Sequence, residues 1–508
     1  MLATVNTLVI TGIEAKTVKV EVDLMAGLPG FELVGLAQAA LKEARERVKS
    51  ALKNSGYEFP NRKIIVNLAP ADLKKEGSHF DLAIALGILL ASGQLLNPPD
   101  PNLFFSGELS LDGSLRPVPG ILPMCLELLK TEPGRTFIIP PGNSREASLV
   151  SEVRSLTAGN LREVCAYLDN NAELSGVSSD KTVPPGGSMP DFADVKGQET
   201  AKRGIQVAAA GSHNLLLIGP PGGGKTMLAR RMPGIMPEMT RDEVLETTRI
   251  YSVAGLLNPD HPLIDTRPFR APHKNASSAS IIGGGRIPRP GEISLAQNGV
   301  LFLDELPEFG RDVLEALRQP LEDKIVTVAR AQATHTYPAD FSLIASMNPC
   351  SCGFYGSELE CTCTPLQIQK YLSRISGPLL DRMDLHIEVP RVNYEQLRDR
   401  GNGQSSAAMR EKVITAREMQ KKRFARLKIN LNSQMRPADV KKHCRLDDES
   451  EILLKNAFDK LKMSARAYDR ILKVARTIAD MEGRDNIRLQ HLGEALQYRS
   501  LDRKYWRN

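Results

Sequence analysis

Three short apolar runs in the middle of the chain, each followed at once by polar residues, predict buried strands. They cover residues 215–218, 299–303 and 341–347. Unbroken apolar runs of this length are typical of parallel strands covered on both faces, whereas half-exposed strands alternate. Beyond residue 407 such runs are missing, and apolar residues recur at helical spacing instead. The pattern therefore predicts an α/β domain with a parallel sheet, followed by a helical region.

The first run leads directly into a segment that fits the phosphate-loop pattern G-x-x-x-x-G-K-[ST] at every position. Its glycines let backbone N–H groups surround an anion, and the helix that follows adds the positive end of its dipole. We expect Lys225 to reach the β- and γ-phosphates of ATP, and the Thr226 hydroxyl to hold Mg²⁺. The predicted nucleotide-binding residues are Gly219, Pro220, Pro221, Gly222, Gly223, Gly224, Lys225 and Thr226.

Polar residues after the other two runs complete a predicted ATPase site. Asp304 is expected to bind Mg²⁺, directly or through water, and Glu305 to polarise the attacking water as general base. Asn348 can hydrogen-bond the γ-phosphate, or it can cap a turn before a proline. Farther along, Arg382 can stabilise charge on the transferred phosphoryl group, or it can form a surface ion pair.

Changes in composition divide the chain. Residues 171–191 are rich in Ser, Gly and Pro, which is the composition of a linker. A second break is expected at 390–406, where a Gly- and Ser-rich segment precedes the helical pattern. We therefore expect an N-terminal α/β domain at 1–170, an ATPase core at 192–390 and a helical domain at 391–508.

Net charge and its distribution along the chain limit which partners can be expected. The formal net charge of +6 permits nucleic-acid binding without arguing for it. Basic residues dominate 410–445, and this run is either a solvated helical face or a phosphate-facing one.

No signal peptide is expected, and the longest apolar run, 82–91, is too short to cross a bilayer. The seven cysteines do not form a secreted framework, so a reducing cytoplasm without membrane contact is expected.

Four of the cysteines form two C-x-C pairs in one segment. Four thiolates can close a tetrahedral structural Zn²⁺ site. The alternative is four reduced thiols in a surface loop. The candidate ligands are Cys350, Cys352, Cys361 and Cys363.

Further motifs lie at 270–273, 283–285, 290–296, 376–382, 464–468 and 475–480. With the motifs above, they make the chain resemble the magnesium-chelatase-like AAA+ ATPases, and most closely the ComM (YifB) family, over essentially its whole length. The resemblance implies a P-loop AAA+ core with a parallel sheet, a C-terminal helical lid and a hexameric ring. It also implies that Asn348 is sensor 1, Arg382 a finger reaching a neighbour's ATP, and Arg466 the sensor 2 arginine of the lid. Lys274 departs from the family, which usually has a histidine there.

Two insertions in the core look like loops that this group projects into the pore of its ring. They cover residues 267–285 and 324–335, and the alternating pattern of the second predicts a β-hairpin. Five basic residues in them are candidates for DNA phosphate contacts, or else they pack in the subunit interface. These residues are Arg267, Arg270, Lys274, Lys324 and Arg330.

Residues 1–170 resemble the Lon proteolytic domain, an α/β fold of the S5 domain 2-like type, through 75–77, 81–83 and 107–121. Alignment on the glycine of the first motif places His79 at the nucleophile position, beside Ser78, and Leu122 at the position of the lysine base. A nucleophile without its base is poorly activated, so we expect a domain that lacks the Ser–Lys dyad. It would then serve assembly, guide nucleic acid or act as a plain scaffold; the surface candidates are Lys74 and Lys75.

Three functions fit these observations. The family resemblance implies an ATP-driven hexameric DNA motor, a helicase or branch-migration translocase acting in homologous recombination and natural transformation. Its partner would be branched, single- or double-stranded DNA, bound without sequence preference through phosphates. The alternative is a metal-chelatase motor subunit, which has the same ATPase core. An ATP-dependent protease is favoured least, because the Ser–Lys pair is missing.

Overall fold

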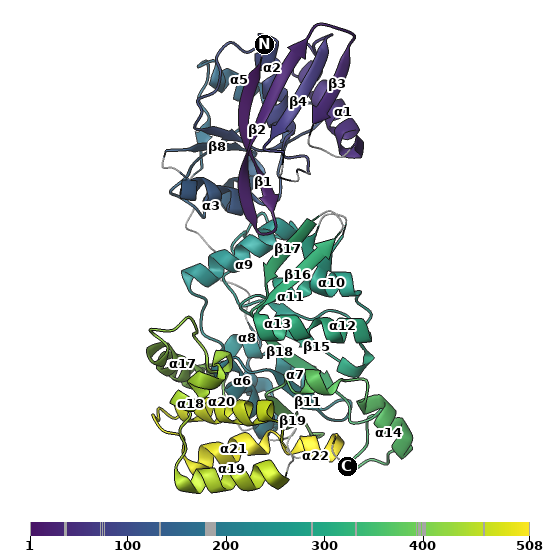
Figure 1. The fold of residues 1–508 in the computed structure, drawn as a ribbon, viewed down its shortest axis with the longest axis vertical. Coiled ribbons are helices and arrows are strands. Elements are labelled where there is room, and N and C mark those ends of the chain that lie inside the picture. The colour runs from purple at the N-terminus through teal and green to yellow at the C-terminus, as the bar shows by residue number, and fades with distance from the viewer. Residues whose placement is uncertain are drawn as a thin grey trace.

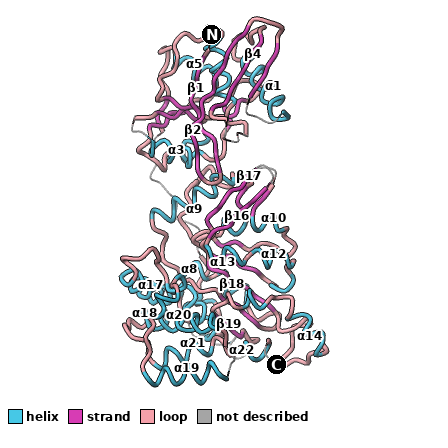
Figure 2. Tube along the Cα trace, in the orientation of Figure 1, coloured by secondary structure: helices cyan, strands magenta, loops and turns pink. Residues whose placement is uncertain are grey.

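The computed structural model describes residues 2–34, 38–71, 73, 75, 77–131, 134–177, 189–285, 288–330, 333–392, 394, 398, 403–460 and 463–506. The molecule is elongated: the N-terminal domain occupies one end, and the ATPase core and the C-terminal helices occupy the other (Figure 1). The tube view separates the two main sheets along this axis (Figure 2). Among the described helices, none combines the length and apolarity needed to span a bilayer.

The N-terminal domain is built on a mixed eight-stranded sheet in the order β10-β9-β8-β5-β1-β2-β4-β3. Helix α2 is buried along its whole length, so the apolar run at 82–91 forms the centre of this domain's core. The strands are β1 (Ala3–Thr11), β2 (Glu14–Met25), β3 (Gly30–Val34), β4 (Lys63–Ala69), β5 (Leu103–Phe105), β8 (Thr136–Ile139), β9 (Arg154–Thr157) and β10 (Ser175–Gly176), with a small pair β6 (Glu108–Leu109) and β7 (Leu115–Arg116). The helices are α1 (Gln38–Asn54), α2 (Asp81–Ala91), α3 (Ile121–Thr131), α4 (Ser144–Ala147) and α5 (Leu161–Leu168).

The first sheet reaches into the stretch that the sequence predicts to be a linker. Strand β10 pairs with β9, and the Val177 N–H donates to the Ser155 carbonyl oxygen at 2.9 Å. Residues 178–188 of the expected linker lie outside the described residues. Phe192 is fully buried in the cluster of the ATPase core. The N-terminal domain therefore continues past residue 170, because backbone pairing holds a segment whose composition suggests a linker.

The ATPase core is a five-stranded parallel sheet in the order β12-β15-β18-β11-β19. All three predicted strands are present, and each is buried along its whole length. The strands are β11 (Leu215–Ile218), β12 (Phe269–Arg270), β15 (Val300–Leu303), β18 (Ser342–Met347) and β19 (Leu385–Glu388). The helices are α6 (Glu199–Gly211), α7 (Lys225–Arg230), α8 (Met232–Ile235), α9 (Arg241–Ala254), α10 (Ser278–Ile282), α11 (Glu292–Leu295), α12 (Arg311–Ala316), α13 (Arg318–Asp323), α14 (Pro365–Leu372) and α15 (Gly377–Leu380).

The predicted hairpin in the second insertion is present. It consists of β16 (Ile325–Arg330) and β17 (Ala333–Pro338), paired antiparallel, and residues 331–332 at its tip lie outside the described residues. Figure 1 places it at the end of the core that faces the N-terminal domain. A Cβ atom built on Gly12, in the turn between β1 and β2, would lie 3.6 Å from His335 Nδ1. The hairpin therefore contacts the N-terminal domain as well as the core. A second short pair joins β13 (Gly283–Gly284) to β14 (Arg289–Pro290).

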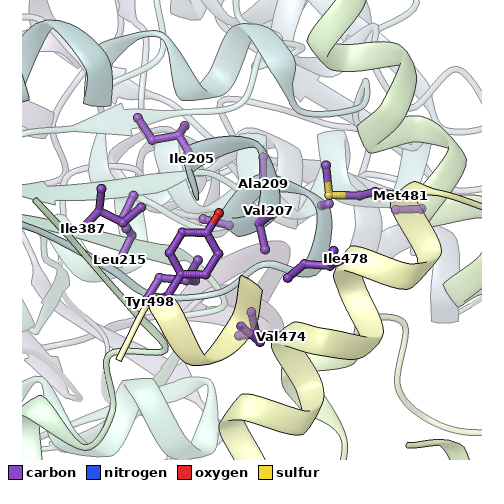
Figure 3. Packing of buried hydrophobic residues seen from close by; sticks show 14 of the residues in the cluster. Ile205, Val207, Ala209, Leu215, Ile387, Val474, Ile478, Met481 and Tyr498 are labelled. Atoms are coloured by element: carbon purple, nitrogen blue, oxygen red, sulfur yellow. The ribbon is translucent and has the colours of Figure 1, made fainter. Parts of the chain in front are cut away.

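The C-terminal helices share one hydrophobic core with the sheet. Helix α20 carries a strongly apolar face, and its Val474 and Ile478 pack in the same cluster as Leu215 of β11 and Ile205 of α6 (Figure 3). A buried ion pair between Arg423 and Asp480 at 2.5 Å ties the first lid helix to α20. The helices are α17 (Ser406–Arg423), α18 (Pro437–His443), α19 (Asp448–Lys460), α20 (Ala465–Met481), α21 (Leu489–Gln497) and α22 (Leu501–Tyr505).

A buried polar contact joins the N-terminal domain to helix α9 of the core. The Ser252 hydroxyl donates to Glu146 Oε1 at 2.5 Å, and the Leu122 N–H donates to the same oxygen at 2.8 Å. Burial raises the pKa of Glu146, and these hydrogen bonds act in the opposite direction. At the edge of this contact Arg145 pairs with Asp260 at 3.1 Å. The two domains are thus held by specific hydrogen bonds in addition to chain connectivity.

The buried His79 predicts a pH dependence for the N-terminal domain. Burial lowers its pKa to about 4, so the unfolded chain, with a value near 6.5, binds the proton more tightly. Stability from this group is complete above pH 6.5 and is lost as the pH falls toward 4, by up to about 1.4 kcal/mol per unit. Asp81 at the start of α2 acts in the opposite direction, because burial raises its pKa to about 6. We therefore expect the loss in the difference between the parent and a His79 variant, measured by hydrogen exchange of the α2 amides, corrected for intrinsic rates, between pH 7 and 4.5.

Two variants separate His79 from the other titrating groups. His79→Gln should lower the opening free energy of α2 at pH 7, and its difference from the parent should shrink toward pH 4.5. His261→Gln, in a half-exposed position outside this domain, should match the parent at every pH. A difference between the parent and His79→Gln that stays constant across this range would contradict the assignment.

Candidate ATP site and four-cysteine loop

The phosphate loop joins β11 to α7 and fits closely against the end of β19. A Cβ atom on Gly219 would lie 2.0 Å from the Val389 carbonyl oxygen, so only glycine is compatible with this approach. Gly222 and Gly224 have positive φ values of 76° and 85°, which aim the loop's N–H groups into its concave side. The loop, Asp304, Glu305, Ser346 and Asn348 line a cavity of about 450 Å³.

Lys225 and Asn348, expected to contact the phosphates, are brought together in this cavity. Lys225 Nζ donates to Asn348 Oδ1 at 3.1 Å and to the carbonyl oxygens of Gly219 at 2.7 Å and Pro220 at 3.0 Å. Burial lowers the pKa of Lys225, while the nearby Asp304 and Glu305 raise it. The ammonium group is therefore held by three neutral acceptors that anionic phosphate oxygens can replace.

Thr226 and Asp304, the expected Mg²⁺ residues, are also adjacent. Thr226 Oγ1 donates to Asp304 Oδ2 at 2.8 Å, and the Ser346 hydroxyl donates to the other carboxylate oxygen. Hydroxyl and carboxylate oxygens are the hard donors that Mg²⁺ prefers, so the pair fits the ion. Ser346 was missed by sequence reasoning, because nothing in an apolar strand singles out the residue facing the neighbouring acid.

Glu305 occupies a strained position at the mouth of the cavity. Its φ of 56° and ψ of 50° are left-handed, which is rare for a residue with a side chain. Its N–H donates to Ser346 Oγ at 3.3 Å, and its carboxylate accepts from Lys274 Nζ at 2.5 Å. In this structure the charge of Lys274 is engaged by the predicted general base, and its contact with DNA stays a prediction.

Arg382 and Arg466 lie together but outside this cavity. The Arg382 guanidinium is 5% exposed, pairs with Glu322 and donates to the Pro378 carbonyl oxygen at 2.6 Å. Arg466, at the start of α20, is exposed. The hydrogen bond from Arg382 lowers the pKa of Glu322, and the charges of Arg466 and Arg470 lower it further. In this chain Arg382 pairs with Glu322, Arg466 acts on the same carboxylate through its charge, and neither arginine lines its own phosphate cavity.

Three other expected DNA contacts are held in internal ion pairs. Arg267 is 10% exposed and donates to the carbonyl oxygens of Pro237 at 2.6 Å and Asn298 at 2.7 Å. Arg270 forms a two-pronged pair with Glu292, and Lys324 pairs with Asp340. In this structure nearby acids bind these three charges, and their contacts with DNA phosphates stay predictions. The side chain of Arg330 lies outside the described residues.

The basic run at 410–445 keeps a set of solvent-facing charges. Arg410, Arg417 and Arg423 are used internally, in contacts with Glu238, the Ala209 carbonyl oxygen and Asp480. The remaining charges lie on the surface of the lid, where they fit either a solvated helical face or a phosphate-binding face. The exposed members are Lys412, Lys421, Lys422, Arg426, Lys428, Arg436, Lys441, Lys442 and Arg445.

The four clustered cysteines converge to a metal-sized group. Their sulfur atoms all lie within 4.8 Å of one another, with Cys350 to Cys352 at 3.3 Å and Cys350 to Cys361 at 3.7 Å. Tetrahedral Zn–S bonds of about 2.3 Å require sulfur separations of about 3.8 Å, so the set fits Zn²⁺. The Phe354 N–H lowers the pKa of Cys352 to about 6, which favours the thiolate form.

Among the described residues of the N-terminal domain, the two positions expected for a Ser–Lys dyad hold no such pair. His79, at the nucleophile position, is buried, and Leu122, at the lysine position, is fully buried in a separate core cluster. The adjacent Ser78 donates to Glu108. Lys75 is wrong as a surface candidate, because it is 1% exposed and donates to the Leu73 carbonyl oxygen at 3.0 Å. Lys74 lies outside the described residues.

Comparison with known proteins places these features in one family. The family model described as magnesium chelatase, subunit ChlI, matches residues 191–397, the subunit ChlI model matches 20–143, and the ChlI C-terminal model matches 403–499. The competence protein ComM of Haemophilus influenzae is 48% identical over 97% of this chain and 96% of that protein. The uncharacterised protein YifB of Salmonella typhimurium is 46% identical over 99% and 98%. A magnesium-chelatase 67 kDa subunit of Chlorobaculum parvum is 25% identical over 31% of this chain and 23% of that subunit.

The geometry of the cavity predicts that removing the charge of Lys225 weakens ATP binding. Lys225→Ala should weaken binding of a fluorescent ATP analogue by tenfold or more, because it removes the cation aimed at the β- and γ-phosphates. Lys421→Ala, an exposed lid lysine, is the matched control and should bind as the parent does. Equal affinities for the Lys225 variant and the parent, measured by fluorescence titration, would remove this cavity as the nucleotide site.

Proposed function

The chain belongs to the ComM and YifB family of magnesium-chelatase-like AAA+ proteins, and on this premise we propose that it is an ATP-driven DNA motor. The proposed form is a hexameric ring that moves along DNA and promotes branch migration during homologous recombination and natural transformation. The observation that carries the proposal is the match to a competence protein over nearly the whole length of both chains. The meeting of five expected ATPase residues in one cavity supports it: Lys225, Thr226, Asp304, Glu305 and Asn348.

The proposed ATPase chemistry uses residues already close together. Mg²⁺, held by Thr226 and Asp304, would neutralise charge on the phosphate oxygens. Lys225 would bind the β- and γ-phosphates, and Asn348 would orient the γ-phosphate or the attacking water. Glu305 would accept a proton from that water, which requires its carboxylate to leave Lys274 first. Pairing with Lys274 thus keeps the base occupied until nucleotide arrives.

We propose that Arg382 and Arg466 complete the site of a neighbouring subunit. Arg382 pairs with Glu322, the charge of Arg466 acts on the same carboxylate, and both arginines lie outside the phosphate cavity of their own chain. A guanidinium that binds a carboxylate in this way can also bind a phosphate, because the two anions offer similar oxygen pairs. Head-to-tail contacts of this kind close into a ring when the rotation between subunits permits.

DNA binding in this proposal depends on phosphates rather than bases. The exposed lysines and arginines of the lid offer charge without a groove-reading element, so binding should fall steeply with salt. Branch migration exchanges equivalent base-pair steps, each worth about 1.4 kcal/mol, so its net cost is small. ATP would supply direction and the ability to pass mismatched sequence.

The proposal includes a structural Zn²⁺ on the four cysteines and a place in the cytoplasm, where thiols stay reduced and DNA is present. The metal-chelatase alternative is supported by a short match of 162 residues at 25% identity. It fits less well, because the matches at 45% identity or more extend over the N-terminal domain too. The protease alternative is opposed by the buried His79 and Leu122.

The motor function predicts coupled changes in turnover and DNA structure. ATPase activity should rise several-fold on four-way or forked DNA, and a labelled strand should be displaced only while ATP is hydrolysed. Glu305→Gln should still bind ATP and DNA but displace nothing, because the general base is missing. Protein that stays monomeric with ATP and neither binds nor remodels branched DNA, by sedimentation and gel assays, would overturn the proposal.

A mixing experiment tests whether Arg382 acts across a subunit boundary. Lys225→Ala and Arg382→Ala should each be nearly inactive alone. In an equal mixture about a quarter of the interfaces would join an intact Lys225 to an intact Arg382, so turnover should recover to about that fraction.

The matched control mixes Lys225→Ala with Glu305→Gln. Both residues belong to the same subunit's site, so no interface in that mixture is intact and turnover should stay low. Recovery in the control, or normal turnover by Arg382→Ala alone, would contradict the assignment to a neighbouring site.

A further inference from the structure

The segment that carries the four cysteines is an irregular loop placed directly after Asn348. Residues 348–364 run from β18 to α14 without helix or strand. Long irregular loops in compact domains usually need a specific stabilising feature. The sulfur cluster supplies one, because Cys350 and Cys352 at the start of the loop meet Cys361 and Cys363 near its end.

The start of this loop rests on the phosphate loop. Gly353 has a φ of 90°, and its N–H donates to the Cys350 carbonyl oxygen at 3.1 Å. A Cβ atom on Gly353 would lie 2.6 Å from Pro221 Cδ and 2.9 Å from Pro221 Cγ. The turn formed by the first two cysteines therefore touches the wall of the nucleotide cavity, because Pro221 is one of its lining residues.

The middle of the loop is held from the other side by the C-terminal helix. The ring of Tyr355 meets that of Tyr505 edge-on at 6.4 Å, and a Cβ atom on Gly356 would lie 3.4 Å from Lys504 Cε. Lys504 in turn pairs with Glu388 at 2.6 Å. Glu388 ends β19, one residue before the Val389 carbonyl oxygen that abuts Gly219.

Two segments thus pack against the phosphate loop, and both are connected to the cysteine loop. One is Gly353 against Pro221, and the other is the end of β19 against Gly219. The same loop also begins at Asn348, whose side chain accepts a hydrogen bond from Lys225. Because Cys350 follows Asn348 by two residues, a shift of Cys350 also shifts Asn348, the residue expected to contact the γ-phosphate.

We propose that a metal ion bound by the four thiolates acts as a clamp on the ATP site, so that nucleotide affinity depends on metal loading. The inference rests on the proposed function, because it uses the same nucleotide cavity and the same Zn²⁺. Four cysteine ligands close the coordination sphere, so the ion has no open position for substrate. Its role is to fix Gly353 and Asn348 against the phosphate loop.

The test measures zinc and nucleotide binding separately on the full-length protein. The parent should contain one Zn²⁺ per chain by elemental analysis, and Cys361→Ser with Cys363→Ser should contain none. The same double variant should bind a fluorescent ATP analogue, in excess Mg²⁺, at least tenfold more weakly than the parent. Thr362→Ala, an exposed position between these two cysteines, is the matched control and should keep both the metal and the affinity.

A second arm avoids any folding defect of the cysteine variant. Zinc is removed from the parent with a selective chelator while Mg²⁺ is kept in excess, and then restored. The affinity for the analogue should fall and recover with the zinc content, and circular dichroism should show unchanged helix content throughout.

The outcomes separate this inference from the proposed function. A parent that binds the analogue but carries no zinc, or a zinc-free protein that binds it at full affinity, would overturn the clamp and leave the ATPase proposal intact. A parent that carries zinc but binds no analogue would overturn the ATPase proposal. Lys225→Ala should keep its zinc while losing the nucleotide, which shows that metal binding does not depend on the ATP site.

Discussion

The contact between the phosphate loop and the end of β19 is the constraint on which the ATP site depends. A carbonyl oxygen of Val389 fills the space where any side chain on Gly219 would lie. The loop can therefore sit at the carboxyl edge of the sheet, where β11, β15 and β18 end side by side. Ligand sites of parallel sheets form at this edge, because the strands deliver their following residues to one place. Thr226, Asp304 and Asn348 meet there for that reason.

The lid and the core behave as one packed body, since α20 shares its apolar face with α6 and β11. This packing explains the position of the two arginines. Arg466 at the start of α20 is carried to the side of the core where Arg382 pairs with Glu322, away from the cavity of the same chain. The phosphate cavity and the arginines near Glu322 are thus separate in one chain, which is why we assign the arginines to a neighbouring subunit's site in the proposed ring.

The N-terminal domain is built around the buried helix α2, which packs in one core with the strands of its sheet. His79, the position expected to match a Lon-type nucleophile, is buried just before this helix. The domain is attached to the core through Glu146 and Ser252, and through the β-hairpin that meets the β1–β2 turn. In this structure the domain therefore contacts both helix α9 and the β16–β17 hairpin of the ATPase core.

The sequence alone determined the strands and the residues that follow them, because unbroken apolar runs and the phosphate-loop spacing are local patterns. It also identified the four cysteines, whose spacing is short enough for them to meet. It did not determine which charges are free: Lys274, Arg267 and Arg270 pair with acids distant in the chain, and composition cannot reveal such partners. Nor could it reveal that Ser346 faces Asp304, or that Gly353 rests on Pro221. Those relations depend on how strands and loops from separate parts of the chain pack, and only the tertiary structure decides them.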